Sequence, residues 1–402
     1  MTDRKPIATS AQLARNMKLF VFVKVFQKRV FLPLAGIYFT TRAGFKISDL
    51  GLLFAWFALV QIIVEVPTGY FADRYGKVLS MRIGAFLNII SCFIYVFYAN
   101  PIGIYLAYTF EATGYSFFGG ANEAAIHDTL QAQGKAGQYT KLFSRIQAVS
   151  LGINAVLLAL VPLTYKVDPR LPFVIGMLMY TLLFIVNLNL TEVYEPLNRE
   201  IGKQRRSKIQ SMVQFKKLLP FFLILGYISS LYTAPSDYIT ILLAQLGVRP
   251  YFLGFMFSAA SVFGVIIGFG IHYLKKLSLR QYILFDVSLL MFFFGSLWSA
   301  IVPLIIVAFI INVAFWRYRR IVYQAEIYEI LPVREKAVLF SVLNNSSQVF
   351  EFFVPLLFGF IIARSSISVA FGLSGLIAAF ITVPLLAQTS QLGVRAKEFM
   401  KQ

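Results

Sequence analysis

The chain has 402 residues, of which 58% are hydrophobic and only 14% are charged. Soluble domains carry about a quarter charged residues, so this composition excludes an ordinary soluble enzyme or binding module. Apolar runs of about 20 residues recur along the sequence, and this is the length that an α-helix needs to cross a bilayer. Lipid cannot satisfy backbone polar groups, and the runs are continuous rather than alternating. We therefore expect an all-α polytopic membrane protein rather than a barrel.

The apolar runs predict twelve transmembrane helices. The first run lacks the short apolar core and small-residue cleavage site of a signal peptide, so we expect it to stay in the protein. Glycines, prolines and charge clusters set the ends of the runs. The spans lie near 17–40, 49–70, 79–98, 101–128, 142–164, 171–190, 217–245, 251–274, 281–299, 302–330, 338–362 and 369–388.

Positive charges are unequally distributed over the connecting segments. Twelve spans place both termini on one side, and the segments joined to that side, together with the span ends next to them, hold 25 Lys and Arg residues, against 6 on the other side. The positive-inside rule therefore predicts cytoplasmic termini in an inner (cytoplasmic) membrane. It also accounts for most of the net charge of +19, so we expect no nucleic-acid partner. The single cysteine, Cys92, excludes a disulfide within one chain.

The longest polar connection, TEVYEPLNREIGKQRRSKIQSMVQFKK, divides the chain into two halves. We expect an amino-terminal six-helix bundle at 1–190, a cytoplasmic linker at 191–216, a carboxy-terminal six-helix bundle at 217–388 and a cytoplasmic tail at 389–402. The tetrapeptides KLFS at 141–144 and VLFS at 338–341 open the fifth and eleventh spans. This echo favours an internal duplication into two pseudo-symmetric halves, an arrangement in which transporters hold a solute between the halves.

The stretch GYFADRYGK, residues 69–77, predicts a cytoplasmic loop of about ten residues between spans two and three. Its glycines allow tight turns, and Asp73 can accept hydrogen bonds from a helix amino terminus. The spacing G-x-x-x-D-R-x-G-K resembles the signature of the major facilitator superfamily, and only Val78 departs from it, at the last basic position. The candidate gating residues are Gly69, Asp73, Arg74, Gly76 and Lys77.

The resemblance covers essentially the whole chain, since the twelve spans, the cytoplasmic termini and the basic central linker also match that family. It implies the family's fold, with spans one, four, seven and ten around a central cavity, and transport by alternating access. It also implies that Asp73 acts as a gating latch against the other half. The fifth span lacks the G-x-x-x-G-P-x-x-G-G pattern of proton-driven exporters, which weakens the case for drug–proton antiport.

Four polar residues interrupt the first span. Lys24, Gln27 and Lys28 share one face of a continuous helix, and Arg29 lies beside them near mid-span. A charge at this depth costs about 3 kcal/mol on insertion scales, so it normally faces a cavity or a partner. We interpret all four as candidate substrate-binding residues. For Lys24 the alternative is that its long side chain reaches the cytoplasmic headgroups.

Other predicted spans carry further candidate residues. The substrate-binding candidates outside the polar group of span one are Tyr38, Tyr108, Tyr115, Trp316, Arg317, Arg320, Asn344 and Gln348. The candidates for proton coupling or ion pairing are Glu111, Glu351 and Asp237. For Glu111 two roles stay open, and the same holds for Glu351. Each is either the fixed partner of a buried arginine or a proton carrier.

These features predict a secondary active transporter that moves a small organic solute, with protons as the coupling ion. The excess of buried bases favours a solute that bears a carboxylate or phosphate, because arginine forks suit planar anions. The alternatives are a multidrug efflux pump for lipophilic or cationic compounds and a lipid flippase on the same fold. No catalytic or metal-binding spacing stands out, so we expect no enzyme activity, no cofactor and no metal. We expect a monomer in the lipid bilayer.

Overall fold

The computed structural model describes residues 7–194, 226–227, 230–231, 236–274, 279–330 and 336–380. Side chains are described in these ranges except at 140, 268–274, 279–280, 283, 317–330 and 336–347. Helices and their connecting turns make up these ranges, which contain no strand. The predicted all-α class is therefore confirmed.

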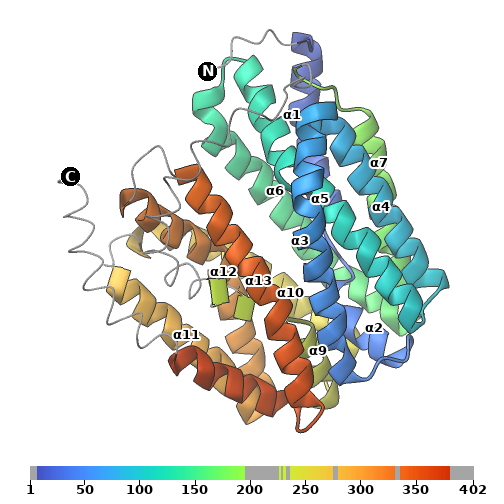
Figure 1. Cartoon of the computed structure of the whole chain (residues 1–402), viewed down its shortest axis with the longest axis vertical. Coiled ribbons are helices and arrows are strands. Elements are labelled where there is room, and N and C mark those ends of the chain that lie inside the picture. The colour runs from blue at the N-terminus through green and yellow to red at the C-terminus, as the bar shows by residue number, and fades with distance from the viewer. Residues whose placement is uncertain are drawn as a thin grey trace. The chain divides into compact units, whose positions relative to one another are not determined.

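The chain folds into two compact units. Unit 1 comprises Met1–Phe45, Trp56–Ile201 and Pro250–Ser258, and unit 2 comprises Lys46–Ala55, Gly202–Arg249 and Ala259–Gln402. Helices up to α7 (Figure 1) are α1 (Ser10–Phe26), η1 (Leu32–Leu34), α2 (Ala35–Thr41), η2 (Ile47–Asp49), α3 (Leu50–Tyr75), α4 (Lys77–Phe97), α5 (Pro101–Ala132), η3 (Ala136–Gln138), α6 (Tyr139–Leu160), η4 (Val161–Lys166) and α7 (Leu171–Leu188). Later helices are α9 (Ser236–Gln245), η6 (Pro250–Phe252), α10 (Leu253–Leu274), α11 (Leu279–Ser299), α12 (Val302–Ile330), α13 (Lys336–Ile362) and a helix at Ile367–Phe380.

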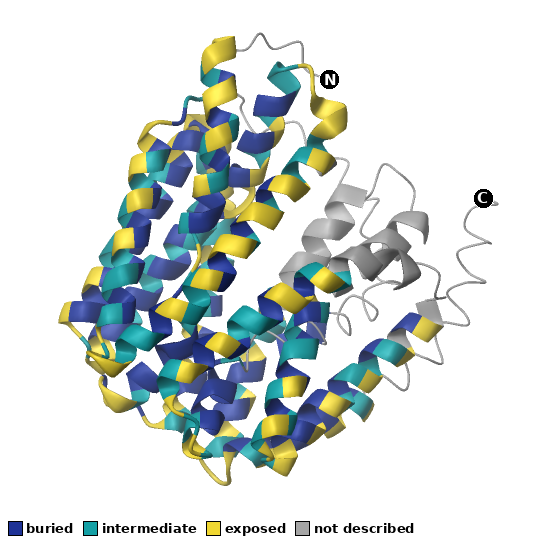
Figure 2. Cartoon of the chain, turned by 180° about the vertical axis from the view of Figure 1, so that it is seen from behind, coloured by how far each residue is buried: buried dark blue, intermediate teal, exposed yellow. Residues whose placement is uncertain are grey.

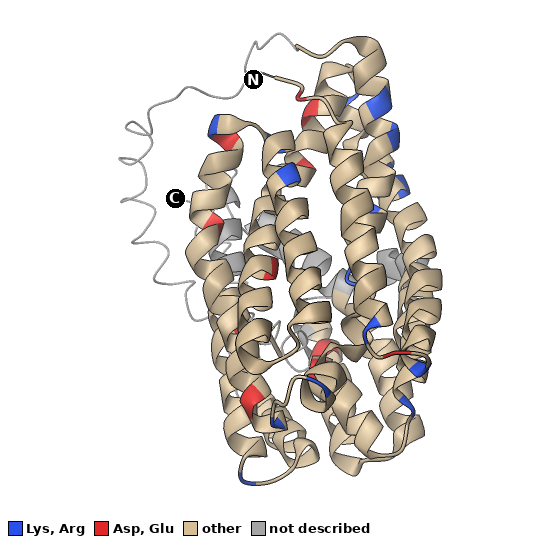
Figure 3. Cartoon of the chain, turned by 90° about the vertical axis from the view of Figure 1, so that its right-hand side faces the viewer, with Lys and Arg blue, Asp and Glu red and all other residues tan. Residues whose placement is uncertain are grey.

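Among the described residues, 5 helices are long and apolar enough to cross a membrane: Ile47–Tyr75, Lys77–Phe97, Lys141–Lys166, Leu171–Leu188 and Pro250–Ile267. Buried and exposed residues alternate around the helices of unit 1, so each has a packed face and an outer face (Figure 2). Charged residues are sparse along the middles of these helices and gather toward their ends (Figure 3). The count of twelve spans stays a prediction, because parts of the chain lie outside the described residues.

Small residues bring α4 and α5 into close contact, and the two helices lie side by side in Figure 1. A Cβ added to Gly84 would lie 2.7 Å from the Gly114 carbonyl oxygen, and one added to Gly114 would lie 2.8 Å from that of Gly84. Ser80 on α4 donates a hydrogen bond to the Phe117 carbonyl at 2.7 Å. Membrane helices associate through such small residues and interhelical hydrogen bonds, because lipid provides no hydrophobic drive. This contact holds α5, which carries Glu111, in place.

The first predicted span, 17–40, is not one continuous helix. Turns at 27–31 and the 3₁₀ helix η1 separate α1 from α2. Pro33 explains the interruption, because proline lacks the N–H of a helical hydrogen bond and disfavours the α conformation of the residue before it. The expectation of an unbroken span was therefore wrong. Gln27, Lys28 and Arg29 lie in the interruption, so they do not share a helical face with Lys24.

A kink divides α5 at Gly119, whose backbone angles of φ −25° and ψ −125° are not helical. A Cβ at Gly119 or at the neighbouring Gly120 would meet no atom within 4 Å, so packing does not require glycine at either position. Two adjacent glycines weaken a helix through their backbone freedom. The kink separates the part of α5 that carries Glu111 from the part that carries Asn122.

The GYFADRYGK stretch is helical almost to its end. Since α3 extends through Tyr75 and α4 begins at Lys77, only Gly76 lies between them. Gly76 makes the reversal with φ +113°, which residues with a Cβ rarely adopt. Gly69 lies inside α3, and a Cβ there would meet nothing within 4 Å. The predicted loop and the predicted turn at Gly69 were therefore wrong.

A strap, residues 189–194, follows α7 and crosses the ends of helices in unit 1. Arg82 on α4 donates to three carbonyls at and just after the end of α7, at 3.0, 3.3 and 3.0 Å. Asn16 on α1 donates to the Thr191 carbonyl at 2.8 Å and accepts from the Thr191 N–H at 3.1 Å. Glu192 accepts from the Val78 N–H at 2.8 Å. The first residues of the predicted linker are thus attached to unit 1, whereas the half boundaries themselves stay predictions.

The starts of α3 and α10 make the same kind of contact. In unit 2, a Cβ added to Gly51 on α3 would lie 2.3 Å from the Pro355 carbonyl oxygen on α13. In unit 1, a Cβ added to Gly254 on α10 would lie 2.2 Å from the Leu158 carbonyl oxygen on α6. The helices α3 and α10 correspond to predicted spans two and eight, and α6 and α13 to spans five and eleven. This correspondence fits the internal duplication that the sequence favours.

Candidate functional site

The interruption of span one removes helical hydrogen bonds, and side chains of α5 and α6 replace some of them. The Tyr115 hydroxyl donates to the Gln27 carbonyl at 3.4 Å, and the Ser150 hydroxyl donates to the Lys24 carbonyl at 2.8 Å. The Asn122 amide donates to the Gln27 side-chain oxygen at 3.1 Å. Non-helical backbone is tolerated at membrane depth only where protein or water satisfies it. The Tyr115 and Ser150 hydroxyls therefore satisfy two backbone carbonyls of the interrupted segment, and Asn122 holds the Gln27 side chain beside them.

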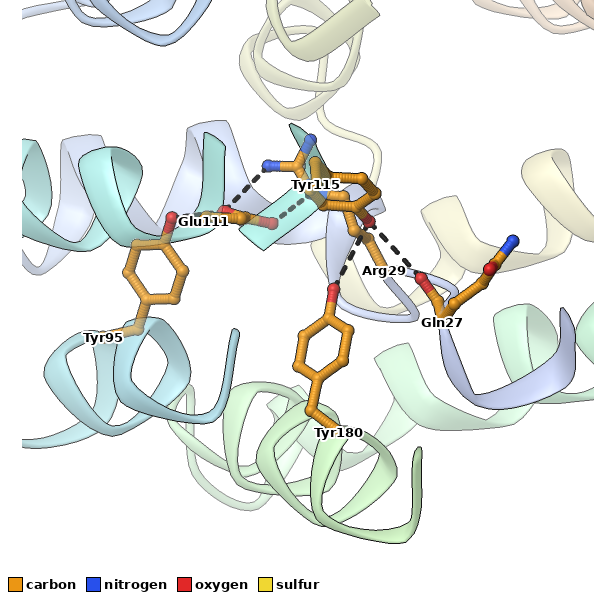
Figure 4. A network of polar contacts seen from close by, with 6 residues as sticks. All are labelled: Gln27, Arg29, Tyr95, Glu111, Tyr115 and Tyr180. Atoms are coloured by element: carbon orange, nitrogen blue, oxygen red, sulfur yellow. Dashed lines mark hydrogen bonds and ion pairs between the residues drawn. The ribbon is translucent and has the colours of Figure 1, made fainter. Parts of the chain in front are cut away.

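Arg29 and Glu111 form an ion pair beside this segment (Figure 4). Arg29 Nε lies 2.6 Å from Glu111 Oε1 but is not aligned for a hydrogen bond, whereas Nη2 donates to Oε2 at 3.2 Å. The Tyr95 hydroxyl donates to the same Oε2 at 2.6 Å. Glu111 is fully buried, and a buried carboxylate needs a cation and further hydrogen bonds. The structure thus contains the ion pair, and the role of proton carrier stays a prediction.

The Arg29 guanidinium also contacts two aromatic rings. The guanidinium carbon lies 5.4 Å from the centre of the Phe57 ring and 5.8 Å from that of Tyr115. The Arg29 side chain is 20% exposed, and Nη1 points away from Glu111 in Figure 4, with no hydrogen bond to any described residue. Two aromatic faces thus orient the group, and its N–H donors remain for a carboxylate or phosphate.

The two lysines of span one have different surroundings. Lys24 lies in the last turn of α1 and is 5% exposed, and its ammonium is 5.4 Å from the centre of the Phe143 ring on α6. This burial argues against the alternative in which Lys24 extends to the headgroups. Lys28 is exposed and takes part in an interaction of its own. Lys24 is therefore the buried lysine of the segment.

The predicted site tyrosines divide into one that lies in the site and two that pack beside it. The Tyr115 hydroxyl is 3.3 Å from the Tyr180 hydroxyl, next to Arg29 (Figure 4). Tyr108 is 2% exposed and packs among aromatic rings. Tyr38 is fully buried and donates to the Tyr95 carbonyl at 2.8 Å. Tyr38 thus packs in the core of unit 1, and its role as a substrate contact stays a prediction.

Unit 2 contains the remaining predicted site residues. Asp237 is buried in the first turn of α9, and Gln348 and Glu351 are half-buried on α13; all three take part in interactions. Trp316 on α12 is 42% exposed. Outside the described side chains lie Arg317, Arg320 and Asn344. A joint site of these residues with Arg29 stays a prediction.

The charged residues of the GYFADRYGK motif have separate surroundings in unit 1. Lys77 forms an ion pair with Asp128 near the end of α5. Arg74 donates to the Tyr70 hydroxyl at 2.7 Å. Asp73 is exposed and makes no hydrogen bond or ion pair with any residue that the structure describes. The latch role of Asp73 stays a prediction.

A carboxylate that the sequence reasoning missed, Glu192, occupies the amino terminus of α4. A Cβ added to Gly76 would lie 2.9 Å from Glu192 Oε2, which accepts from the Val78 N–H. Burial raises the pKa of Glu192 above its ordinary value of 4.5, and hydrogen bonds from the backbone of Val78 and Lys77 lower it only in part. The sequence interval of 114 residues between Glu192 and Val78 explains why no local pattern identified this cap.

Three residues of the Arg29 site were also missed: Tyr95, Asn122 and Tyr180. Each lies on a helix that is distant in sequence from Arg29, and isolated tyrosines are abundant in this chain. The local signals available were Pro33 for the interruption and the glycine pair for the α5 kink. Together the assembled groups provide a guanidinium group, hydroxyl groups for hydrogen bonds and a buried carboxylate. No cluster of three or more metal-ligating side chains occurs among the described residues.

A bundle of apolar helices with a charged, non-helical segment inside it defines a polytopic membrane protein of the transporter class. The chain belongs to the Major Facilitator Superfamily, whose family model matches residues 19–318. The family confirms the resemblance carried by GYFADRYGK, and it identifies a membrane transporter for a small-molecule substrate rather than an enzyme.

Known relatives agree with this assignment. The uncharacterized MFS-type transporter YxaM of Bacillus subtilis (strain 168) is 24% identical over 376 residues, which cover 90% of this chain and 91% of that protein. The solved nucleoside transporter NupG has a TM-score of 0.76 at 12% identity, covering 94% of this chain and 99% of its own. The solved peptide transporter POT in complex with sulfate has a TM-score of 0.72 at 13% identity, covering 98% of each chain. At these identities the structures establish the fold alone.

Proposed function

We propose that this transporter moves a small organic anion, bearing a carboxylate or a phosphate, together with protons. The observation that carries the proposal is the Arg29–Glu111 pair at the interruption of span one, which leaves Arg29 Nη1 without a hydrogen bond to any described residue. Arginine binds planar anions through such N–H donors, and discontinuous helices commonly form the binding sites of transporters.

The same pair supports a coupling step. A solute anion that takes the Arg29 fork displaces Glu111, and the released carboxylate, buried and without its cation, binds a proton. The Tyr95 hydroxyl stays within reach of the Glu111 side chain during this exchange. When Glu111 returns to Arg29, it releases the proton and the solute together. The empty and the loaded site then carry the same charge, because one proton balances one negative charge of the solute.

The proposed setting is the inner (cytoplasmic) membrane, with both termini in the cytoplasm and the protein acting as a monomer. The unequal distribution of Lys and Arg, 25 against 6, supports this orientation. Alternating access of the two halves exposes the site to each side in turn, and Asp73 latches one of the two states. Membership of the family supports the alternating-access part of this proposal.

The experiment combines binding with flux. Thermal stabilisation of the purified full chain across metabolites and drugs identifies binders, which are then tested for uptake into proteoliposomes. We expect acidic solutes to stabilise the protein and to accumulate when a pH gradient is imposed. The variant R29M/E111Q, in which both charges are removed, should lose uptake. The control R364M, which removes an exposed arginine after α13, should keep it.

Unchanged uptake in R29M/E111Q would refute the site. Stabilisation confined to lipophilic cations would favour multidrug export, and movement of headgroup-labelled lipid between leaflets would favour a flippase.

A further inference from the structure

We infer that Lys24 is a second anion-binding residue of the proposed site. The inference rests on the proposed function and adds a second cationic group to it, for which a carboxylate is the first candidate ligand.

Lys24 is a buried ammonium group that has no counterion among the described residues. Its side chain is 5% exposed, and its Nζ faces the Phe143 ring with 5.4 Å to the ring centre. None of the residues that the structure describes gives this Nζ a hydrogen bond or an ion pair. An aromatic face offsets only part of the cost of burying an ammonium group. A charge of this kind inside a membrane normally marks a solute or ion site.

The three cations around the interruption differ in how their charge is compensated. In the empty site Arg29 is neutralised by Glu111. Lys28 is exposed and has an interaction of its own, so it is not a buried charge in need of a partner. Lys24 is then the buried cation whose charge a solute anion can compensate, whether Glu111 stays on Arg29 or is displaced from it.

Glu123 is the competing partner of Lys24. Its charge acts on Lys24, but Glu123 is exposed and forms no ion pair with it in the described structure. Glu123 lies beyond the kink at Gly119, and an ion pair with Lys24 in another state of α5 is the alternative to an anion site. That alternative requires Lys24 and Glu123 jointly, whereas an anion site requires Lys24 alone.

Unpaired acceptors near the same backbone segment indicate a further group on the solute. Ser150 donates to the Lys24 carbonyl, and Asn154, which donates to Ser150, keeps a buried side-chain oxygen without a hydrogen bond to the described residues. The side-chain oxygen of Asn122, beside Gln27, is also buried without a hydrogen bond to a described residue. A hydroxyl group on the solute can donate to such oxygens, so we expect a carboxylate that also carries a hydroxyl group to bind best.

The test compares carboxylates with their neutral amides on the purified full chain. The probe pairs are lactate with lactamide and benzoate with benzamide. Apparent dissociation constants come from thermal stabilisation at constant ionic strength and neutral pH. For the wild type we expect lactate to bind about tenfold more tightly than lactamide.

Variants at Lys24 then test the charge. K24M fills a similar volume, K24Q is a second uncharged variant, and K24R keeps the charge. We expect K24M and K24Q to bring lactate and lactamide within about threefold of each other without changing lactamide, and K24R to keep the preference. K135Q, which removes an exposed lysine before α6, and E123Q should both behave like the wild type.

Two results overturn the inference. The first is a preference for lactate that K24M and K24Q retain or that the wild type lacks. The second is a loss of the preference for lactate in E123Q that the double variant K24M/E123Q restores. Lys24 would then be the counterion of Glu123 rather than an anion-binding residue. The two proposals can fail separately. If the wild type takes up the anion and the Lys24 variants keep its preference for lactate over lactamide, only the role of Lys24 is refuted. If lactate binding depends on Lys24 but no uptake is detected, transport of that anion is refuted.

Discussion

Asn122 and Gln27 join the two interrupted helices of unit 1. The Asn122 amide nitrogen donates to the Gln27 side-chain oxygen at 3.1 Å, although the residues lie 95 positions apart. Gln27 directly follows α1, and Asn122 lies just beyond the α5 kink. A movement of either segment therefore strains a hydrogen bond to the other, and this contact connects the surroundings of Arg29 with the carboxy-terminal part of α5.

Loss of one member of the Arg29–Glu111 pair should destabilise the protein more than loss of both. R29A leaves a buried carboxylate without its cation, and we expect the free energy of unfolding to fall by about 3–5 kcal/mol. In R29M/E111Q both charges are gone and an amide oxygen still accepts from Tyr95, so we expect a loss below about 1 kcal/mol. Thermal melting of the purified variants measures both; equal losses would contradict a buried pair.

Gly76 and Gly69 should respond in opposite ways to alanine. G76A places a Cβ at a positive φ and 2.9 Å from Glu192 Oε2, so we expect a loss of about 1–3 kcal/mol. G69A adds a Cβ in open space inside α3, where replacing glycine stabilises a helix by up to about 1 kcal/mol. Melting temperatures compare the two variants. A larger loss of stability in G69A than in G76A would instead support the turn at Gly69 that the sequence predicted.

Gly254 should be intolerant of a single added methyl group. Its Cβ would lie 2.2 Å from the Leu158 carbonyl oxygen and 2.6 Å from Pro162 Cγ, so we expect G254A to lose about 1–3 kcal/mol by overpacking. The control is G152A on α6, where a Cβ meets nothing within 4 Å. If G254A melts at the same temperature as G152A, the close approach of α10 to α6 is not part of the stable fold.

The raised pKa of Glu192 should make stability depend on pH. Burial favours the protonated Glu192 carboxyl in the folded chain. The resulting contribution to the free energy of unfolding is fully present below the ordinary pKa of 4.5, and it is lost as the pH rises through the raised pKa of the folded chain. E192Q abolishes this titration and keeps an oxygen for the Val78 N–H. We expect the melting temperature of E192Q, relative to the wild type, to increase from acid to neutral pH.

Melting curves over that pH range provide the measurement, with E123Q as a control that removes an exposed carboxylate. A constant difference between E192Q and the wild type would show that Glu192 does not titrate differently on folding.

The charge balance of the proposed coupling step predicts electroneutral uptake. One anion moves with one proton, so a membrane potential should change solute accumulation by less than about twofold, while a pH gradient drives it. Net movement of one charge would instead change accumulation by roughly 50-fold per 100 mV, from about 2.3 kcal/mol per charge. Potassium gradients with valinomycin, applied to proteoliposomes with and without a pH gradient, separate the two cases.

Local sequence was sufficient for the class of protein and for its family. Hydropathy acts on each segment separately, so apolar runs predicted membrane helices without knowledge of their neighbours. The GYFADRYGK spacing is likewise contained in nine adjacent residues, and it indicated the family that the comparison confirmed. Arg29 and Glu111 were recognisable as charges at membrane depth for the same reason, although their mutual partnership was one of two open roles.

The tertiary structure alone decided how those charges are compensated. Arg29 finds its carboxylate 82 residues away, and the Tyr95 hydroxyl comes from another helix. Pro33 accounts for an interrupted helix, but the interruption persists because α5 and α6 satisfy its exposed polar groups. Lys24 has no such partner in the part of the chain that the structure describes, and only its burial distinguishes it from a lysine at the headgroups. In lipid each buried polar group depends on whichever helix passes beside it, and that neighbour is set by packing rather than by sequence distance.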